Sequence, residues 1–384
     1  MPSIVYLVPN LADPAVARRI AMLRAGGATV SVAGFLRGGA VVPELHVQHC
    51  VCLGHTFDAR FTQRIAAVVR GVLRMTGRLA NWPRPDLIIA RNLEMLPLAR
   101  RLQNRWARQP QLVYECLDIH RLLLRQDWLG RSLRAAERHW SRTAALLITS
   151  SPGFLRHYFD AQSSLPTLLL ENKVLLTQGA IPPSPRTMCP NGVIRIGWFG
   201  ALRCQRSLDA LAALSDRWDG RVEVVLRGRP ALSEFRDFFA QIAGHPHLRF
   251  LGPYSAAELP QIYAEVDASW AIDFFEEGQN SAWLLPNRLY EGCLFGAIPI
   301  AVAGTETAGY LQRHGLGVVV PDIAAATLDN MVAQLTPERM ERLAAAVAQA
   351  EPTQFAHGAE DCRALVARLA SLGSADTQAA GALA

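Results

Sequence analysis

The chain has 384 residues, 50% of them hydrophobic and 19% charged, and its formal net charge is +6. This balance excludes disorder over most of the length, and the length exceeds what one hydrophobic core usually serves, so two domains are expected. The seven cysteines include no CxxC pair, which excludes the common zinc and redox motifs and indicates reduced thiols.

Apolar strand-like runs alternate with amphipathic helical stretches along the chain, which is typical of parallel α/β sheets. The expected strands of the first half are residues 4–8, 29–33, 87–90, 112–115 and 146–149. The expected helices between them are residues 15–25, 61–79, 96–106 and 132–144. Four prolines between residues 182 and 190 then interrupt the pattern, which predicts a proline-rich linker over residues 179–192.

The same pattern restarts after the linker. The expected strands of the second half are residues 195–199, 223–227, 248–251, 268–271, 298–301 and 317–320. The sequence therefore predicts two Rossmann-like domains that face each other across a cleft, where α/β folds bind ligands. The predicted parts are a first domain at 1–178, the linker, a second domain at 193–350, a helix at 351–372 that crosses back to the first domain, and a disordered tail at 373–384.

A glycine turn follows the first strand of the second domain. That strand ends at Gly200, the chain then passes Arg203 and Arg206, and Ser207 can cap the helix that follows. Exposed amides at a helix start with arginines beside them form a receptor for a diphosphate. An ordinary glycine-bearing turn with solvated arginines explains the segment equally well. The dinucleotide pattern GxGxxG occurs nowhere in the chain.

A second motif begins at Pro286, which suits the first position of a helix that runs to Gly296. Asn287 and Arg288 then lie in the first turn and Glu291 about 5.4 Å further along. Asn287 or Arg288 can meet a nucleotide's phosphates while Glu291 accepts hydrogen bonds from its ribose. The alternative is a surface ion pair between Arg288 and Glu291.

Taken together, these segments resemble a known family. The glycine turn, "VEVVLRG", "HPHLRFLGPYSAAELPQIYAEVDASWA" and "LPNRLYEGCLFGAIPIAVAG" resemble the donor-binding half of GT-B glycosyltransferases of family 4. In the first half, "PDLIIARNLEML", "LVYECLDIHRLL", "LLITSSPGF" and "LLLENKV" fall where those enzymes place a strand and its functional loop. The chain is most similar in pattern to bacterial exopolysaccharide glycosyltransferases of the succinoglycan type, over nearly its full length.

The resemblance implies a hexosyltransferase that moves glucose from UDP-glucose to a lipid-linked oligosaccharide acceptor in exopolysaccharide or envelope polysaccharide biosynthesis. The nucleotide sugar is a substrate, and no cofactor is expected. The residues that it implies for donor binding are Gly200, Arg203, Arg206, Arg227, Gly252, Tyr254, Asn280, Asn287, Arg288 and Glu291. Arg206 is also expected to act in catalysis, by meeting the charge of the leaving diphosphate.

The chain departs from the family at Trp283, where members commonly have a glutamate eight residues before Glu291. A replacement contact to the sugar must then come from elsewhere, and the candidates are Asp273, Glu276, Glu277 and Asn280. The alternative for this acidic cluster is a solvated loop. The missing acid leaves both the retaining and the inverting outcome open.

Polar residues follow three strands of the first domain, at the strand ends that face the predicted cleft. The catalytic candidates are Asp118, as the base that deprotonates the acceptor hydroxyl, and His120. The candidates for acceptor binding are Asn10, Asp13, Arg91 and Asn92. Each can instead be a turn or cap residue, and Asp13 before Pro14 suits a helix cap.

No metal is expected, because the chain contains no Asp-x-Asp pair to hold Mg²⁺ or Mn²⁺ on a diphosphate. Two other readings remain open. A sugar-nucleotide 2-epimerase would use the same nucleotide half without an acceptor, and a non-catalytic scaffold or regulatory subunit would explain Trp283.

Charge and hydropathy predict a peripheral protein at the cytoplasmic face of the plasma membrane. Residues 1–178 hold 23 Lys and Arg against 11 Asp and Glu, a balance of +12 that leaves −6 for the rest. Helix 61–79 carries several of these arginines beside apolar residues, so it can dock on an anionic membrane surface or simply pack on the core. No signal peptide precedes residues 4–8, and no apolar run is long enough to cross a bilayer. The bases are not interleaved with aromatic residues, so nucleic acid is not expected as a partner. The oligomeric state stays open.

Overall fold

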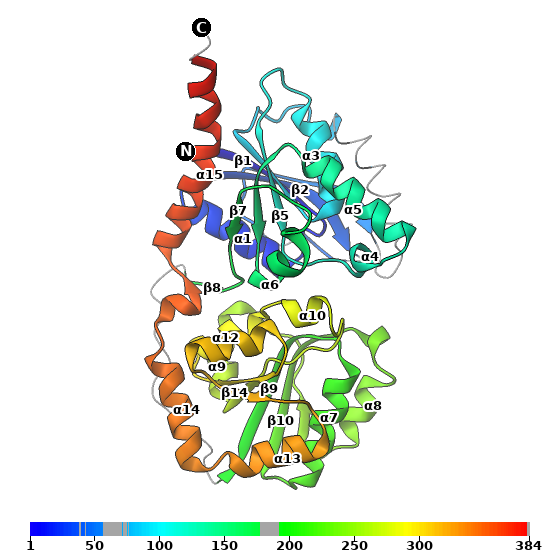
Figure 1. Cartoon of the computed structure of the whole chain (residues 1–384), viewed down its shortest axis with the longest axis vertical. Helices are drawn as coiled ribbons and strands as arrows, with labels where there is room; N and C mark the ends of the chain where they lie inside the picture. Colours follow the sequence, from blue (N-terminus) through cyan, green and yellow to red (C-terminus); the bar gives the residue numbers. More distant parts are fainter. Residues whose placement is uncertain are drawn as a thin grey trace. The chain divides into compact units, whose positions relative to one another are not determined.

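A computed structural model describes residues 1–37, 40–42, 44–56, 71, 75, 77–176 and 192–381, with the side chains of 374–381 left out. It divides into two compact units, which are Met1–Leu170 with His357–Ala384, and Glu171–Ala356 (Figure 1). Residues 179–191 of the predicted linker and most of helix 61–79 lie outside the described residues.

The first unit is built on a seven-stranded sheet with the order β3-β2-β1-β4-β5-β6-β7, in which neighbouring strands are parallel. The strands are β1 (Ser3–Val8), β2 (Thr29–Arg37), β3 (His49–Thr56), β4 (Leu87–Arg91), β5 (Gln111–Cys116), β6 (Ala144–Thr149) and β7 (Thr167–Leu169). Residues 4–8 of β1 are all buried, as expected for a strand covered on both faces. The five predicted strands are confirmed.

The sequence misses β3 and β7 for different reasons. β3 mixes histidine, cysteine and glycine, so no apolar alternation marks it. β7 is a three-residue edge strand in which Thr167 and Leu169 are exposed. Both are held in place by a neighbouring strand rather than by their own pattern.

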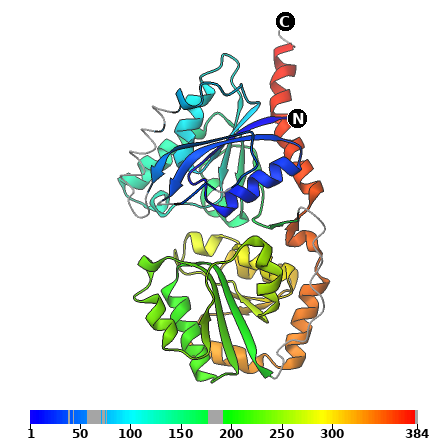
Figure 2. The same ribbon diagram turned by 180° about the vertical axis from the view of Figure 1, so that it is seen from behind.

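Helices cover both faces of this sheet. They are α1 (Pro14–Ala25), η1 (Leu93–Met95), α3 (Leu96–Gln103), α4 (Arg121–Leu124), α5 (Trp128–Ser141), α6 (Pro152–Phe154), η2 (Leu155–Phe159) and α15 (Ala359–Gly381). α15 packs along α1 (Figure 2), and a Cβ on Gly26 would lie 2.1 Å from the carbonyl oxygen of Cys362, so this contact requires glycine. α15 extends to Gly381, into the stretch from residue 373 that the sequence predicts as a disordered tail.

The second unit contains a six-stranded parallel sheet with the order β11-β10-β9-β12-β13-β14. The strands are β9 (Ile194–Leu202), β10 (Val222–Pro230), β11 (Leu248–Phe250), β12 (Ala268–Trp270), β13 (Ile298–Val302) and β14 (Val318–Val320). All six match predicted strands. Trp198 and Trp270 are the largest fully buried side chains of its core.

The helices of the second unit follow the strands in turn. They are α7 (Gln205–Arg217), η4 (Leu232–Glu234), α8 (Phe238–Ala243), η5 (Ala256–Glu258), α9 (Leu259–Ala264), α10 (Asn280–Trp283), α11 (Asn287–Leu294), α12 (Glu306–His314), α13 (Ala325–Gln334), α14 (Pro337–Gln349) and η6 (Pro352–Gln354). A two-stranded sheet pairs β8 (Val174–Leu175) with β15 (Ala356–His357). Within the described residues, every helix is too short or too polar to span a membrane.

Candidate active site

Three glycines mark the carboxyl ends of the strands β9 and β10 and the loop after β11. Gly200 and Gly228 lie opposite each other in the register of β9 and β10, with φ of +106° and +134°. A Cβ on Gly228 would lie 1.8 Å from the carbonyl oxygen of Gly200, so only glycine fits there. The Gly228 amide donates to the carbonyl of Gly252 at 2.9 Å. This edge of the sheet therefore presents bare backbone, which a ligand can approach closely.

The aromatic ring of Tyr254 stands beside this edge. Its hydroxyl would lie 3.8 Å from a Cβ on Gly200, and its ring is 6.3 Å from that of Phe199. Burial raises the pKa of the Tyr254 hydroxyl above its ordinary value, and the charge of Glu291 raises it further. The predicted donor residues Gly200, Tyr254 and Glu291 are thus neighbours in one place.

Arg203 lies in the connection from β9 to α7. Its Nη2 is 3.2 Å from Oδ2 of Asp273, and its guanidinium lies 4.7 Å from the centre of the Phe275 ring. Burial raises the pKa of Asp273, but Arg203 and Arg288 outweigh it and hold the pKa below its ordinary value. Asp273 is therefore a carboxylate at neutral pH.

Arg206, in the first turn of α7, is more exposed. It forms an ion pair with Glu277 and lies 4.2 Å from the centre of the Phe274 ring. Half of each charged side chain is open to solvent, with exposed fractions of 53% for Arg206 and 58% for Glu277. An ion pair of this kind contributes little to stability, so an anionic ligand can replace Glu277 on Arg206.

The second predicted motif forms α11, although with shifted ends. Pro286 caps the helix rather than opening it, and the helix ends at Leu294 rather than at Gly296. Arg288 and Glu291 are 7% and 9% exposed. Their burial rules out the alternative of a solvated surface pair.

Arg288 and Glu291 contact different partners. Nη2 of Arg288 donates to the carbonyl of Ile272 at 2.8 Å and lies 4.0 Å from Oδ2 of Asp273. Burial lowers the pKa of Arg288, and its Nε has no hydrogen-bond acceptor among the described residues. Oε2 of Glu291 accepts from the hydroxyl of Tyr263 at 3.3 Å. A buried guanidinium and a buried carboxylate thus lie one helical turn apart.

The remaining donor candidates take varied places. Arg227 lies in β10 next to Gly228 and its Nη2 donates to Glu265 at 3.2 Å, while its Nε lacks an acceptor within the described ranges. Asn280 is 2% exposed in α10, whereas Asn287 is exposed at the start of α11. Four residues were candidates for the sugar contact that the family's glutamate makes at the position of Trp283. Two of them, Asp273 and Glu277, form ion pairs with arginines.

In the first unit, Arg91 belongs to a buried network that the sequence did not reveal. Its Nη1 donates to the hydroxyl of Tyr6 at 3.0 Å, and its Nη2 is 3.6 Å from Oδ2 of Asp13. Tyr6 donates to Glu115, which also binds Nε of Arg19 at 2.6 Å. Glu115 is 0% exposed and Arg91 is 4% exposed. Two of the predicted acceptor residues, Asp13 and Arg91, are therefore brought together, with Arg91 held inside.

Asn92 follows Arg91 in an unusual backbone conformation, with φ of +65°. Its amide donates to the carbonyl of Glu115 at 2.7 Å, and its buried Oδ1 has no donor among the residues that the structure describes. A non-glycine residue rarely adopts a positive φ, and such strain concentrates at functional sites. Among the acceptor candidates, Asn92 thus has both strain and an unused acceptor atom.

Three candidates of the first unit, Asn10, Asp13 and His120, accept hydrogen bonds from backbone amides two residues further along the chain. Asp13 caps α1 by accepting from the amide of Ala15 at 2.9 Å, and Nδ1 of His120 accepts from the amide of Leu122 at 3.3 Å at the start of α4. Oδ1 of Asn10 accepts from Ala12 at 3.2 Å. Asp118 and His120 are both exposed in the loop after β5. The cap alternative is confirmed for Asp13 and His120.

Sequence reasoning offered the acids of segment 273–277 as candidates for the sugar contact and missed their pairing with arginines. Asp273, Phe275 and Glu277 contact the two arginines of the β9–α7 connection. The signal in the sequence is the run "DFFEE" directly after a strand, since acids and rings are the side chains that hold guanidinium groups.

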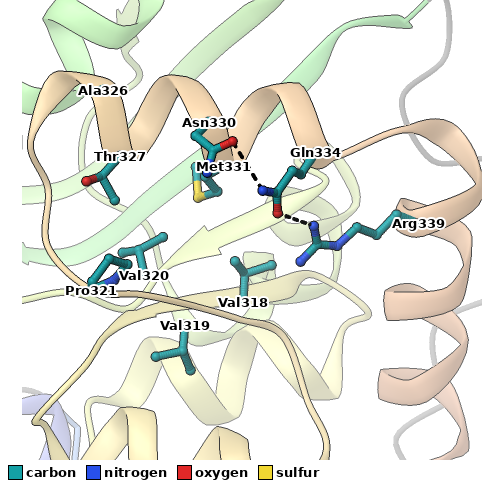
Figure 3. A pocket seen from close by; sticks show the side chains of 10 residues that line it. All are labelled: Val318, Val319, Val320, Pro321, Ala326, Thr327, Asn330, Met331, Gln334 and Arg339. Atoms are coloured by element: carbon teal, nitrogen blue, oxygen red, sulfur yellow. Dashed lines mark hydrogen bonds between the residues drawn. The ribbon is translucent and has the colours of Figure 1, made fainter.

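A separate pocket of about 330 Å³ lies between β14 and α13 (Figure 3). Val318, Val320 and Met331 form its apolar lining. On the polar side, Gln334 donates to Asn330 at 3.1 Å and accepts from Arg339 at 2.7 Å. The pocket contains none of the predicted site residues, and three of its polar side chains, Asn330, Gln334 and Arg339, bond to one another.

Solved structures share the fold across nearly the whole chain. Sucrose-phosphate synthase from Thermosynechococcus elongatus matches with a TM-score of 0.71 and 14% identity, covering 100% of both chains. Anabaena HepE in complex with UDP and glucose matches with a TM-score of 0.69 and 18% identity, covering 97% of this chain and 100% of that one. These similarities show that the chain has the GT-B fold of glycosyltransferases.

A relative in sequence narrows the class. The chain is 50% identical over 379 residues to the succinoglycan biosynthesis protein ExoL of Rhizobium meliloti (strain 1021), which covers 97% of this chain and 94% of that protein. No protein-family model matches. The chain belongs to the succinoglycan biosynthesis protein ExoL family, which confirms the predicted GT-B fold and the resemblance to succinoglycan-type enzymes.

Proposed function

We propose that the chain transfers a hexose from UDP-glucose to a lipid-linked oligosaccharide during exopolysaccharide biosynthesis. Membership of the ExoL family supports the pathway, because that relative is named for succinoglycan biosynthesis. Anabaena HepE, which shares the fold, has been solved with UDP-glucose. That structure supports a UDP-sugar as the donor.

The observation that carries the proposal is the convergence of charged groups on the bare strand ends of the second unit. The glycine edge at Gly200 and Gly228 lies beside Tyr254 and Glu291, and Arg288 lies one turn from Glu291. Cations suit a diphosphate, and a buried carboxylate suits the two hydroxyls of a ribose. One anionic nucleotide can therefore satisfy groups that lie on several different elements.

The chemical need of the reaction is to stabilise the charge that grows on the leaving diphosphate. In the proposed mechanism Arg206 meets this charge after Glu277 has been displaced, and Arg203 and Arg288 hold the ground-state diphosphate. The chain offers these guanidinium groups and no Asp-x-Asp pair, so the proposal is a metal-independent transfer.

On the acceptor side, Asp118 is proposed as the base and Asn92 as a contact to the acceptor hydroxyl. Asp118 is exposed after β5, where a substrate can reach it. The buried Oδ1 of Asn92 supports its role, because an acceptor atom without a donor is costly unless a ligand satisfies it. Arg91 is proposed to fix the adjacent backbone through its network rather than to touch the acceptor.

A lipid-linked acceptor lies at a membrane surface, so the proposal includes peripheral docking at the cytoplasmic face. The charge of +12 over residues 1–178 supports it, since a basic surface is drawn to anionic lipid.

The experiment that tests the function starts with calorimetric binding of UDP, ADP and GDP to the purified chain. Radiolabelled UDP-glucose is then incubated with lipid-linked oligosaccharides, and label is counted in the lipid extract. Transfer of label to lipid supports the proposal. Conversion of the free nucleotide sugar to its 2-epimer would assign the rival enzyme class, and UDP binding without turnover of any sugar nucleotide would assign a scaffold.

A further inference from the structure

Asp273 is the point at which two arginines from different elements meet. Arg203 reaches it from the β9–α7 connection at 3.2 Å, and Arg288 approaches it from α11 at 4.0 Å. The same segment also supplies the carbonyl of Ile272, which accepts from Arg288 at 2.8 Å. Residues 70 and 15 positions away in sequence thus share one carboxylate.

The burial of these groups makes the arrangement rigid. The side chains of Asp273 and Arg288 are 7% and 8% exposed, and that of Arg203 is 28% exposed. Oδ1 of Asp273 also accepts from the amide of Phe275 at 2.8 Å, so the carboxylate itself is fixed. The contrast is with Glu277 four residues later, which holds Arg206 through an ion pair that is largely open to solvent.

The charges explain why a carboxylate is needed at this place. Two guanidinium groups that converge on a buried point repel each other and lose hydration. One carboxylate between them leaves a net charge of +1, which still attracts an anion. Without it, the two groups would move apart and would no longer meet the same ligand.

We infer that Asp273 is a positioning residue of the diphosphate site, which holds Arg203 and Arg288 together so that one nucleoside diphosphate contacts both. This inference rests on the proposed function, because it takes the diphosphate as the ligand. It assigns Asp273 to the arginines rather than to the sugar.

The direction in which one substitution changes UDP affinity distinguishes a positioning role from an effect of charge alone. Asp273→Asn keeps the size of the side chain and removes a negative charge close to the ligand. If charge alone mattered, the variant would bind UDP more tightly than the parent. If Asp273 positions the arginines, the variant binds UDP about tenfold or more weakly despite its greater positive charge. Glu341→Gln is the control, because it removes an exposed negative charge from α14, and its UDP affinity stays within about threefold of the parent.

The experiment is calorimetric titration of UDP into the full-length parent chain and the two variants. Equal or tighter binding by Asp273→Asn overturns the inference, as does an equal loss in Glu341→Gln. If Asp273→Asn does not fold, Asp273→Glu keeps the charge and displaces the carboxylate by one methylene. A loss of about threefold or more in that variant supports positioning, and parental affinity overturns it. A parent that binds none of UDP, ADP and GDP overturns the proposed function and this inference together, whereas a parent that binds UDP beside an unaffected Asp273→Asn overturns the inference alone.

Discussion

The hydroxyl of Tyr263 donates a hydrogen bond to Oε2 of Glu291 at 3.3 Å, inside the core of the second unit. Tyr263 is 0% exposed and Glu291 9% exposed. Burial raises the pKa of the Tyr263 hydroxyl above its ordinary value, and the charge of Glu291 raises it further. The phenol therefore stays protonated and orients a carboxylate that is poised to accept hydrogen bonds.

Replacing Glu291 by glutamine keeps its shape and removes its charge. If this carboxylate accepts from both ribose hydroxyls, the variant binds UDP about 1.5–3 kcal/mol more weakly in a calorimetric titration. Tyr263→Phe removes only the orienting hydroxyl, and we expect a smaller loss of about 0.5–1.5 kcal/mol. Unchanged UDP affinity in Glu291→Gln would restrict Glu291 to a structural role.

Arg206→Ala tests whether the exposed arginine acts on the transition state. A guanidinium that meets the charge of the departing diphosphate lowers kcat when it is lost, by about 2.7–4 kcal/mol in activation free energy, with a smaller change in KM. Arg236→Ala is the control, because this arginine has a side chain that is 84% exposed and carries no predicted role. A change in KM alone would reassign Arg206 to ground-state binding.

The buried network around Glu115 predicts how stability depends on pH. Burial raises the pKa of Glu115, but Arg19 and Arg91 outweigh it and hold the pKa below its ordinary value. A lowered pKa in the folded state means that the carboxylate stabilises the fold above its unfolded pKa of about 4.3. This contribution disappears as the pH falls through the lower, folded pKa.

Glu115→Gln should therefore cost about 3–5 kcal/mol of unfolding free energy at pH 7, because it leaves buried arginines uncompensated. The difference in unfolding free energy between the variant and the parent should narrow as the pH falls below about 4. Urea unfolding over a pH series measures both effects. Glu341→Gln, at an exposed position of α14, should change stability by less than about 0.5 kcal/mol. A gap that does not depend on pH would contradict the ionised state of Glu115.

Metal independence is tested with a chelator. Because the sequence offers no Asp-x-Asp pair, glycosyl transfer should proceed at an unchanged rate in EDTA. Loss of turnover that Mg²⁺ or Mn²⁺ restores would show that guanidinium groups and helix amides do not meet the leaving-group charge alone.

Replacing Arg70, Arg74 and Arg78 by glutamine tests docking on the membrane. Arg70 and Arg74 lie outside the described residues and Arg78 is exposed, so the prediction comes from the sequence. Each arginine near an anionic surface contributes about 1 kcal/mol, so binding to anionic vesicles should weaken by up to about 3 kcal/mol. Binding should also fall with salt, since the Debye length shrinks from about 10 Å at 0.1 M to about 3 Å at 1 M.

The control for this experiment is the triple replacement of Arg221, Arg236 and Arg249, which are exposed in the second unit. It should leave vesicle sedimentation unchanged, and neither triple variant should alter UDP binding. If the parent does not bind anionic vesicles at low salt, membrane docking is excluded from the proposed function. The proposed nucleotide site is unaffected by that result.

The sequence alone determined the two parallel sheets and the motifs at their edges. Local periodicity reveals a strand such as β1, because five consecutive apolar residues need cover on both faces. The glycine near the end of β9 and the proline before α11 are equally local features, so Gly200, Arg206 and Glu291 could be named from their neighbours in the chain.

Only the tertiary structure decided which charges meet. Arg19 lies 96 residues from Glu115, and Arg203 lies 70 residues from Asp273. No periodic pattern encodes contacts over such separations, because they exist only once strands have paired and helices have packed. The sequence predicts Arg91 as an acceptor contact, whereas the packing places it inside a buried ion network. An unpaired charge is costly in the interior, because burial removes its hydration, so the buried Arg91 needs its partners.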